Sequence, residues 1–180
     1  HTGNGENNVP FDDVVNIRSI GGPSNVNTGT GKDLVNIGSL TGSADVADSK
    51  LDDPDPLLGF HHGFLTIDGG DDSSDAESLD KVVVYDSGAT TGKTGILNED
   101  GLTGLGIEEN FGFVFKRFQA VEVRLGTQDD NLFIENTVSG TVTVLAGGGD
   151  DQINVEKTTG VTFLEGGAGD DTFNVNFDEF

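Results

Sequence analysis

Apolar and polar residues alternate in many short segments of this chain. The pattern aspartate, any residue, apolar, any residue, apolar occurs six times, starting at Asp13, Asp33, Asp80, Asp130, Asp151 and Asp171. A period of two places the apolar side chains on one face of a β-strand. No segment shows a convincing helical period, so the pattern predicts an all-β protein built from short strands.

The spacing of these segments indicates an internal repeat. Successive aspartates are 20, 47, 50, 21 and 20 residues apart, so the short interval is one unit and the long ones hold further units with insertions. A second alternating segment precedes several of them, at residues 64–67, 121–125, 142–145 and 161–164. Such a unit buries its apolar face only by stacking on its neighbours. We therefore expect a parallel β-helix or β-roll solenoid with coils of about 20 residues.

Glycine-rich acidic segments separate the two strands of the C-terminal units. Residues 166–174 fit the nine-residue template G-G-x-G-x-D-x-U-x, in which U is apolar, at every specified position. Residues 146–154 differ from it only at Ala146, and residues 125–133 keep one glycine, the aspartate and the apolar position. Glycine permits turns with positive φ, and aspartate presents the oxygen ligands that calcium prefers.

These segments resemble the calcium-binding nonapeptides of RTX proteins, the haemolysin-type and adhesin-type repeat proteins that bacteria secrete. The resemblance implies that calcium lies between the turns of adjacent coils, bound by sixth-position aspartates and by glycine carbonyls. Carried onto matching positions, it assigns one site to Asp151 and Asp171 with the carbonyls around Gly147, Gly149, Gly167 and Gly169. It assigns Asp130 to a weaker site against Asp151, because residues 125 and 128 are not glycines.

Other aspartates are open to a second interpretation, in which they bond their own backbone amides in Asx-turns. Asp150 and Asp170 occupy the fifth turn position, which the template leaves free, so both interpretations stand for them. Further metal candidates are Asp129, Asp71, Asp72 and Asp33. Lys32 adjoins Asp33, which favours the turn interpretation there. The second turn of each unit lacks the template, so calcium turns are expected along one side only.

Charge supports a cation partner. The chain has 32 acidic and 9 basic residues, a net charge of −23 that divalent cations would offset. Such acidity argues against nucleic acid and anionic membranes as partners, which require a basic face. There is no cysteine, so disulfides and thiolate metal sites are excluded. No apolar run approaches the ~20 residues of a membrane span, so membrane insertion is not expected.

We expect residues 1–180 to form a single β-solenoid domain with insertions at about 42–63 and 87–112. The chain begins at His1 without methionine or a signal peptide, so we interpret it as a processed form or a segment of a larger repeat protein. Phe111, Phe113, Phe115 and Phe118 are expected to stack in the core. Asn16, Asn36, Asn154 and Asn174 each lie between the apolar positions of a strand, and we expect them to form a polar ladder up one sheet.

No catalytic residues are predicted. His61 and His62 have no third ligand at a recognisable spacing, and Lys116, Arg117 and Arg124 lack an accompanying His, Tyr or Asp constellation. The sequence therefore favours a secreted, extracellular calcium-binding structural or adhesive module. The alternatives are a filament-forming subunit that self-associates through the solenoid ends, and a module that binds glycans or a cell surface, including a domain associated with a polysaccharide lyase or epimerase.

Overall fold

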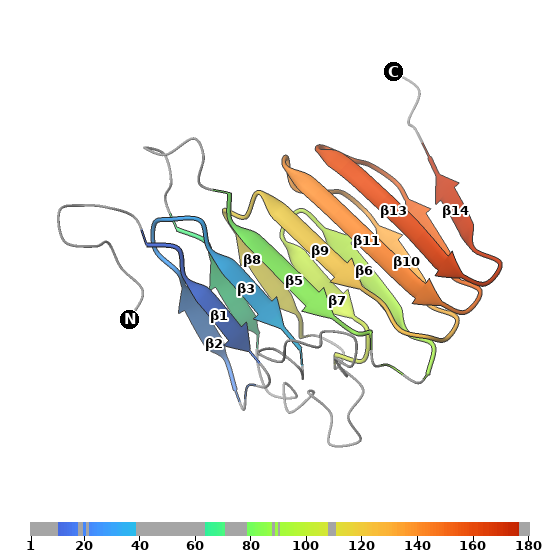
Figure 1. Cartoon of the computed structure of the whole chain (residues 1–180), viewed down its shortest axis with the longest axis horizontal. Helices are drawn as coiled ribbons and strands as arrows, with labels where there is room; N and C mark the ends of the chain where they lie inside the picture. The colour runs from blue at the N-terminus through green and yellow to red at the C-terminus, as the bar shows by residue number, and fades with distance from the viewer. Residues whose placement is uncertain are drawn as a thin grey trace.

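The computed structural model describes residues 11–17, 20, 22–38, 64–70, 79–87, 89, 91–107 and 111–176. Every regular element in these residues is a β-strand, which confirms the all-β prediction. The expected insertion at 42–63 lies outside the described residues. Most strands are parallel and belong to two sheets, which are drawn as two layers in Figure 1.

The first sheet, sheet A, has six strands that are parallel throughout. Their order is β1 (Val14–Ile17), β3 (Leu34–Ile37), β5 (Lys81–Tyr85), β9 (Ala120–Arg124), β11 (Thr141–Gly148) and β13 (Val161–Ala168). The second sheet, sheet B, has eight strands in the order β14 (Thr172–Val175), β12 (Gln152–Val155), β10 (Asn131–Ile134), β6 (Thr94–Asn98), β7 (Gly101–Gly104), β8 (Phe113–Lys116), β4 (Leu65–Asp68) and β2 (Ser24–Asn27).

The chain passes from one sheet to the other at nearly every turn, and we call one passage through both sheets a coil. The register keeps equivalent residues of successive coils side by side: Thr141 pairs with Val161 in sheet A, and Gln152 pairs with Thr172 in sheet B. Partners in both pairs are therefore 20 residues apart, the interval that separates the C-terminal aspartates. Turns leading from sheet A to sheet B form one edge, the A-to-B edge, and the return turns form the B-to-A edge.

The alternation is interrupted once, in the middle of sheet B. After β5 the chain enters β6, reverses through β7 and continues into β8 before it returns to sheet A at β9. Strand β7 is antiparallel to both neighbours, β6 pairs with β10 of the following coil, and β8 pairs with β4 of the preceding one. Much of the expected insertion at 87–112 therefore consists of strands that extend sheet B.

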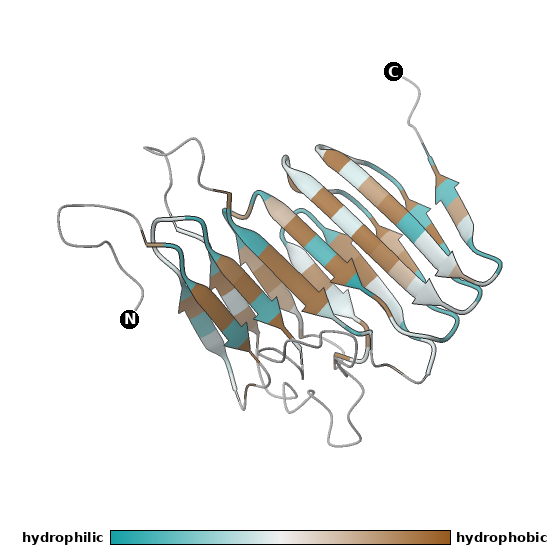
Figure 2. Cartoon of the chain, in the orientation of Figure 1, coloured by the Kyte–Doolittle hydropathy of each residue, from teal (hydrophilic) through white to brown (hydrophobic). Residues whose placement is uncertain are grey.

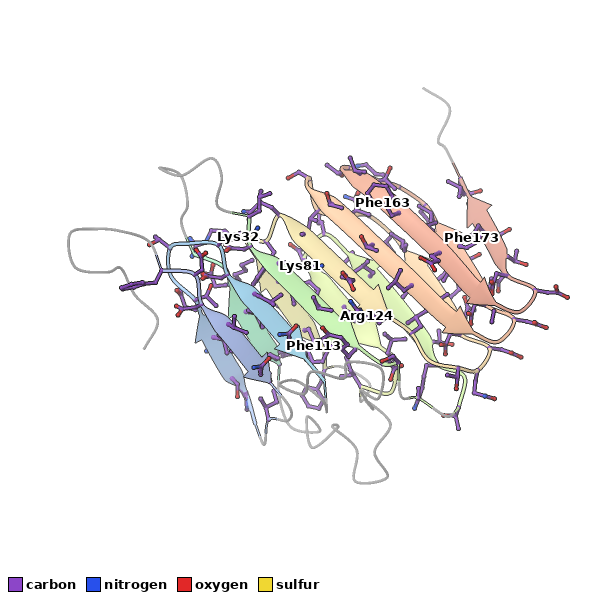
Figure 3. The ribbon with its side chains drawn as sticks, in the orientation of Figure 1. Lys32, Lys81, Phe113, Arg124, Phe163 and Phe173 are labelled. Atoms are coloured by element: carbon purple, nitrogen blue, oxygen red, sulfur yellow. The ribbon has the colours of Figure 1, made fainter. Side chains whose placement is uncertain are left out.

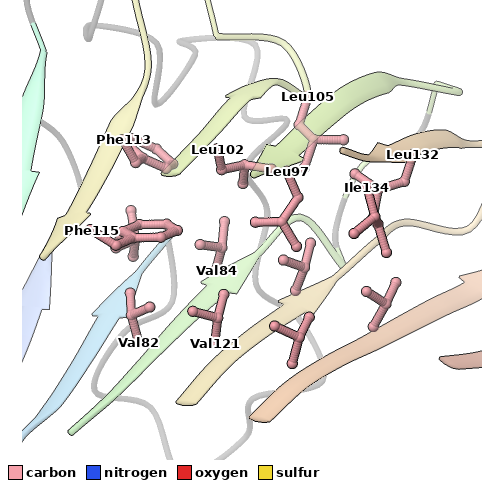
Figure 4. Packing of buried hydrophobic residues seen from close by; sticks show 14 of the residues in the cluster. Val82, Val84, Leu97, Leu102, Leu105, Phe113, Phe115, Val121, Leu132 and Ile134 are labelled. Carbon is pink, nitrogen blue, oxygen red and sulfur yellow. The ribbon is translucent and has the colours of Figure 1, made fainter. Parts of the chain in front are cut away.

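The core lies between the two sheets and is built from the apolar positions of the alternating segments. Each of these side chains removes apolar surface from water, which contributes about 1.5–3 kcal/mol for a fully buried Val, Leu or Ile. The largest side chains exposed below 2% are Ile37, Leu65, Ile67, Leu97, Leu102, Leu125, Leu132, Ile134, Ile153, Val35 and Val82. Figure 2 shows the alternating apolar and polar bands along the strands, and Figure 4 shows the packing between the sheets.

The expected phenylalanine stack is only partly correct. Phe113, Phe115 and Phe118 are buried in the core cluster. Phe111 is half-buried and instead makes an edge-to-face contact with Phe64, with ring centroids 5.9 Å apart. Phe111 precedes β8, so the strand alternation that buries Phe113 and Phe115 does not extend to it.

Candidate functional site

The three C-terminal aspartates of the repeat lie one above another on the A-to-B edge, each immediately before a strand of sheet B. The Asp130 amide donates to Asp151 Oδ1 at 2.7 Å, and the Asp151 amide donates to Asp171 Oδ1 at 3.1 Å. At the other end of this row, the Lys93 amide donates to Asp130 Oδ1 at 2.7 Å. Each carboxylate therefore ties its own turn to the turn of the preceding coil.

The glycines of these turns make the close stacking possible. Gly147 and Gly167 have φ of 99° and 100°, a region that L side chains rarely adopt. A Cβ added to Gly167 would lie 2.1 Å from the Gly147 carbonyl oxygen, and one on Gly147 would lie 2.2 Å from the Gly126 carbonyl oxygen. Gly149 and Gly169 also have positive φ, at 107° and 131°. The structure thus brings together all four glycines proposed as carbonyl ligands.

The fifth-position aspartates form a second row outside the first. The Asp150 amide donates to Asp129 Oδ1, and the Asp170 amide donates to Asp150 Oδ1, both at 2.9 Å. All three side chains are exposed. Neither interpretation drawn from the sequence anticipated this arrangement, in which the carboxylate bonds an amide of the neighbouring coil instead of an amide of its own turn.

Asp130 and Asp151 differ in how their second carboxylate oxygens are satisfied. Asp130 Oδ2 accepts the Gly126 amide of its own turn at 3.0 Å. Asp151 is 1% exposed, and its Oδ2 is buried without a hydrogen-bond partner. Burial, together with the charges of Asp130, Asp171 and Asp129, raises the pKa of Asp151 from 3.8 to about 6. Burial also raises the pKa of Asp130, although the amides of Lys93 and Gly126 counteract it.

The calcium-free protein is expected to lose stability as the pH rises through the pKa of Asp151. The folded state binds this proton more tightly than the unfolded chain, so the contribution is favourable below pH 3.8, falls up to about pH 6 and is constant above it. We expect the unfolding free energy to fall by about 3 kcal/mol over this range because of this carboxyl. Urea unfolding in chelator between pH 4 and 8 would measure this loss as the difference in unfolding free energy between wild type and Asp151→Asn. If that difference did not change with pH, the prediction would be contradicted.

The donor set fits a hard cation in its chemistry. Carboxylate and carbonyl oxygens are what calcium prefers, and the buried Asp151 Oδ2 has no other partner. Within the described residues, no three His, Cys, Asp or Glu side chains are gathered into a metal-binding group. An ion at this edge would therefore be held by Asp151 and Asp171 together with backbone carbonyls, and not by a cluster of carboxylates.

The N-terminal aspartates form a corresponding row on the opposite, B-to-A edge. The Asp13 amide donates to Asp33 Oδ1 and the Asp33 amide to Asp80 Oδ1, both at 2.8 Å, while the Asp80 amide donates to Gln119 Oε1 at 2.7 Å. The repeat aspartates therefore lie on both edges, while the expectation of calcium turns along one side only stays a prediction. The β6–β8 reversal separates the two rows, so the repeat marks the start of sheet A strands before it and of sheet B strands after it.

The further metal candidates fall in different places. Asp33 lies in the B-to-A row, 1% exposed, with its Oδ2 buried and without a hydrogen-bond partner. The amide of Lys32 donates to Asp12 Oδ1 at 3.0 Å, so the residue beside Asp33 belongs to the same inter-coil bonding. Asp71 and Asp72 lie outside the described residues, as do His61 and His62.

Two of the three basic residues weighed for catalysis are held in ion pairs. Arg117 contacts Asp68 Oδ1 at 2.7 Å. Arg124 bonds Glu122 and lies 5.1 Å from the centroid of the Tyr85 ring, on the outer face of sheet A. Burial opposes ionisation of Glu122, but the hydrogen bonds from Lys81 and Arg124 outweigh it and hold the pKa of this carboxyl below its usual value. Lys116 is exposed at the end of β8.

The asparagines form two ladders instead of one. The Asn36 side-chain amide donates to Asn16 Oδ1 at 3.0 Å on sheet A. On sheet B, Asn174 donates to Asn154 Oδ1 at 2.9 Å, and Asn154 donates to Asn131 Oδ1 at 3.1 Å. The expectation of a single ladder up one sheet is wrong, because the repeat precedes sheet A strands before the β6–β8 reversal and sheet B strands after it.

Comparison with known proteins adds no relative. No family model matches the chain, and searches of curated proteins and of solved structures found no similar protein. In the part of the chain that the structure describes, no helix has the length and apolar character needed to cross a membrane.

Proposed function

We propose that this chain is an extracellular calcium-binding structural module, a parallel β-solenoid in which the turns of the A-to-B edge share calcium between adjacent coils. The observation that carries the proposal is the buried, unpartnered Oδ2 of Asp151 within a row of like charges. A cation there would neutralise charges whose mutual repulsion otherwise opposes stacking. Asp151 and Asp171 would hold it, with carbonyls of the turns that contain Gly147, Gly149, Gly167 and Gly169.

The resemblance to RTX proteins supports the same site. It rests on residues 146–154 and 166–174, whose two turns lie directly above one another. Asp130 contributes less, because both of its oxygens already accept backbone amides. Asp129, Asp150 and Asp170 would add negative potential around the ion from the exposed outer row.

Calcium would make the stability of the fold depend on the compartment. Extracellular calcium modules bind with dissociation constants of about 0.1–1 mM, so such a site would be filled outside a cell and empty in the cytosol. We therefore propose a secreted or surface-attached location, where the filled solenoid serves as a rigid structural or adhesive segment.

Calcium titrated into chelated protein tests the proposal. We expect the midpoint of urea unfolding, followed by far-UV circular dichroism, to rise and to saturate at millimolar calcium, because neutralised turns stabilise the stacking of the C-terminal coils. Isothermal calorimetry would give the stoichiometry, with magnesium as the control cation, since magnesium requires a stricter octahedral shell. An unchanged unfolding midpoint with no heat of binding would remove calcium as a ligand of this fold.

A further inference from the structure

Exposed apolar side chains gather at the two ends of the stack. Among the described residues, six of the ten large apolar side chains that are exposed belong to the terminal strands or adjoin them: Phe11, Val14, Val161, Phe163, Phe173 and Val175. Figure 3 labels Phe163 and Phe173 on the last strand of each sheet. Val14, Val161 and Phe163 alternate with the inward-facing residues of their strands and lie on the outer face of sheet A, whereas Phe173 and Val175 continue the interior positions of sheet B.

At the C-terminal end, residues of the interior are uncovered. Phe173 pairs in register with Ile153, and Val175 pairs with Val155, both of which are core residues. Phe173 and Val175 are nevertheless 41% and 42% exposed, because β14 is the last strand of sheet B. Within the described residues the core therefore continues to the last strand of sheet B, where these two interior side chains are exposed.

Some backbone amides and carbonyls of the C-terminal strands also point away from the stack. The amides of Thr172 and Asn176 donate to carbonyls of the preceding coil. In a parallel pair, alternate residues point their amide and carbonyl groups to opposite sides, so those of Phe173 and Val175 are directed away from β12. In sheet A the Val161 amide faces β11, which directs the groups of Thr162 and Leu164 outward.

The N-terminal end offers the complementary edge. The carbonyls of Asp13 and Ile17 accept amides from the β3 side, so the groups of Val14 and Asn16 face out of the stack. The amides of Ser24 and Thr28 donate toward the β4 side, which directs the amide and carbonyl of Asn25 outward. Strands β1 and β2 are the end strands of their sheets, as β13 and β14 are at the other end.

We propose that the C-terminal end of one copy binds the N-terminal end of a second copy, so that both sheets continue across the joint in parallel register. Continuing the register of the stack places Leu164 against the partner's Ile17 in sheet A and Val175 against the partner's Ser24 in sheet B, so that interior positions meet interior positions. Asn176 then lies beside the partner's Asn25 on the outer side of sheet B. Because two different ends meet, the contact is heterologous and can propagate into chains of copies.

Charge sets the conditions for this joint. Copies with a net charge of −23 repel each other, so association should strengthen with salt. The sequence between β1 and β2, residues 18–23, contains no carboxylate, so this connection brings no acidic side chain to the joint. The joint therefore needs no shared calcium ion, and it stands or falls independently of the calcium site.

Two blocking variants test the joint by sedimentation equilibrium in calcium at about 0.5 M NaCl, which shortens the Debye length to a few Å. Val175→Lys places a charge at an exposed interior position of β14. Asn25→Pro removes an amide that faces the joint and keeps the hydrogen bonds between β2 and β4, because the Asn25 amide does not point toward β4. Wild type should associate with rising concentration, and each variant alone should be monomeric. Their equimolar mixture should form one-to-one dimers, because each variant keeps the end that the other has lost.

Matched controls separate the joint from general effects. Phe133→Lys alters a similarly exposed residue, 37%, in the interior of sheet B and should associate like wild type, as should Asn25→Ala, which keeps the amide. Circular dichroism verifies the fold of each variant. A monomeric wild type, or self-association of either blocked variant, overturns the proposal. Association that persists without any heat of calcium binding overturns the calcium proposal alone.

Discussion

Replacement of Asp151 by asparagine is expected to remove most of the stabilisation that calcium confers while the chelated protein remains folded. Asparagine keeps the oxygen that accepts the Asp130 amide and loses only the charge and the ligand strength of the carboxylate. In chelator the variant should be as stable as wild type or more so, because repulsion from Asp130 and Asp171 is relieved. A residue that only closes a turn would show the same change with and without calcium.

The size of the calcium effect follows from binding linkage. A site with a dissociation constant of about 0.1 mM, in about 10 mM calcium, gains about 2.7 kcal/mol of unfolding free energy. We expect wild type to show a gain of this order in urea unfolding and Asp151→Asn to show less than about a third of it. An undiminished gain in the variant would remove Asp151 from the site.

Asp33→Asn is the matched control for this experiment. Asp33 is as deeply buried as Asp151, at 1% exposed, and accepts the Asp13 amide in the same way, but it lies on the opposite edge beside Lys32. The control should therefore keep the full calcium gain. If Asp33→Asn also loses it, ions bind along both edges and the assignment to the A-to-B edge is wrong.

Alanine at Gly147 is expected to destabilise the protein by about 3 kcal/mol even in chelator. The residue has φ of 99°, and its new Cβ would lie 2.2 Å from the Gly126 carbonyl oxygen. Both the strained backbone and the forced separation of adjacent turns oppose stacking, and neither depends on an ion. Chemical unfolding monitored by circular dichroism would measure the loss.

Gly22→Ala is the control for that substitution. No atom lies within 4 Å of a Cβ built on Gly22, and its φ is outside the left-handed region. Its unfolding midpoint should change little. Equal losses in the two variants would mean that removal of glycine, and not the contact between turns, is responsible.

Sequence periodicity predicted the strands and the C-terminal turns but not the edge on which each turn lies. Alternation after Asp151 and Asp171 correctly indicated β12 and β14, because a period of two determines which face of a strand is buried. It does not determine which sheet the strand joins. Between Asp80 and Asp130 the chain makes the β6–β8 reversal, and spacing alone does not reveal how many crossings it makes between the sheets.

The residues that end the two rows were missed for a related reason. Lys93 and Gln119 hold the row position next to Asp130 and Asp80, yet neither carries the aspartate that marks the repeat. A signal was present, since each immediately precedes a strand, as the aspartates do. The bond from an amide to a carboxylate on the next coil depends on tertiary stacking, which no local pattern encodes.

Strands β11 and β13 pair with an offset of 20 residues, and this offset has a consequence for how the protein can change over evolutionary time. Thr141 pairs with Val161, so residues 141–160 form a complete segment that ends where the next equivalent segment begins. Duplication or deletion of this stretch would leave every remaining residue on its original face and edge. The array can therefore lengthen or shorten by whole segments on the C-terminal side of the reversal, while a change of half a segment would turn the acidic bends to the other side.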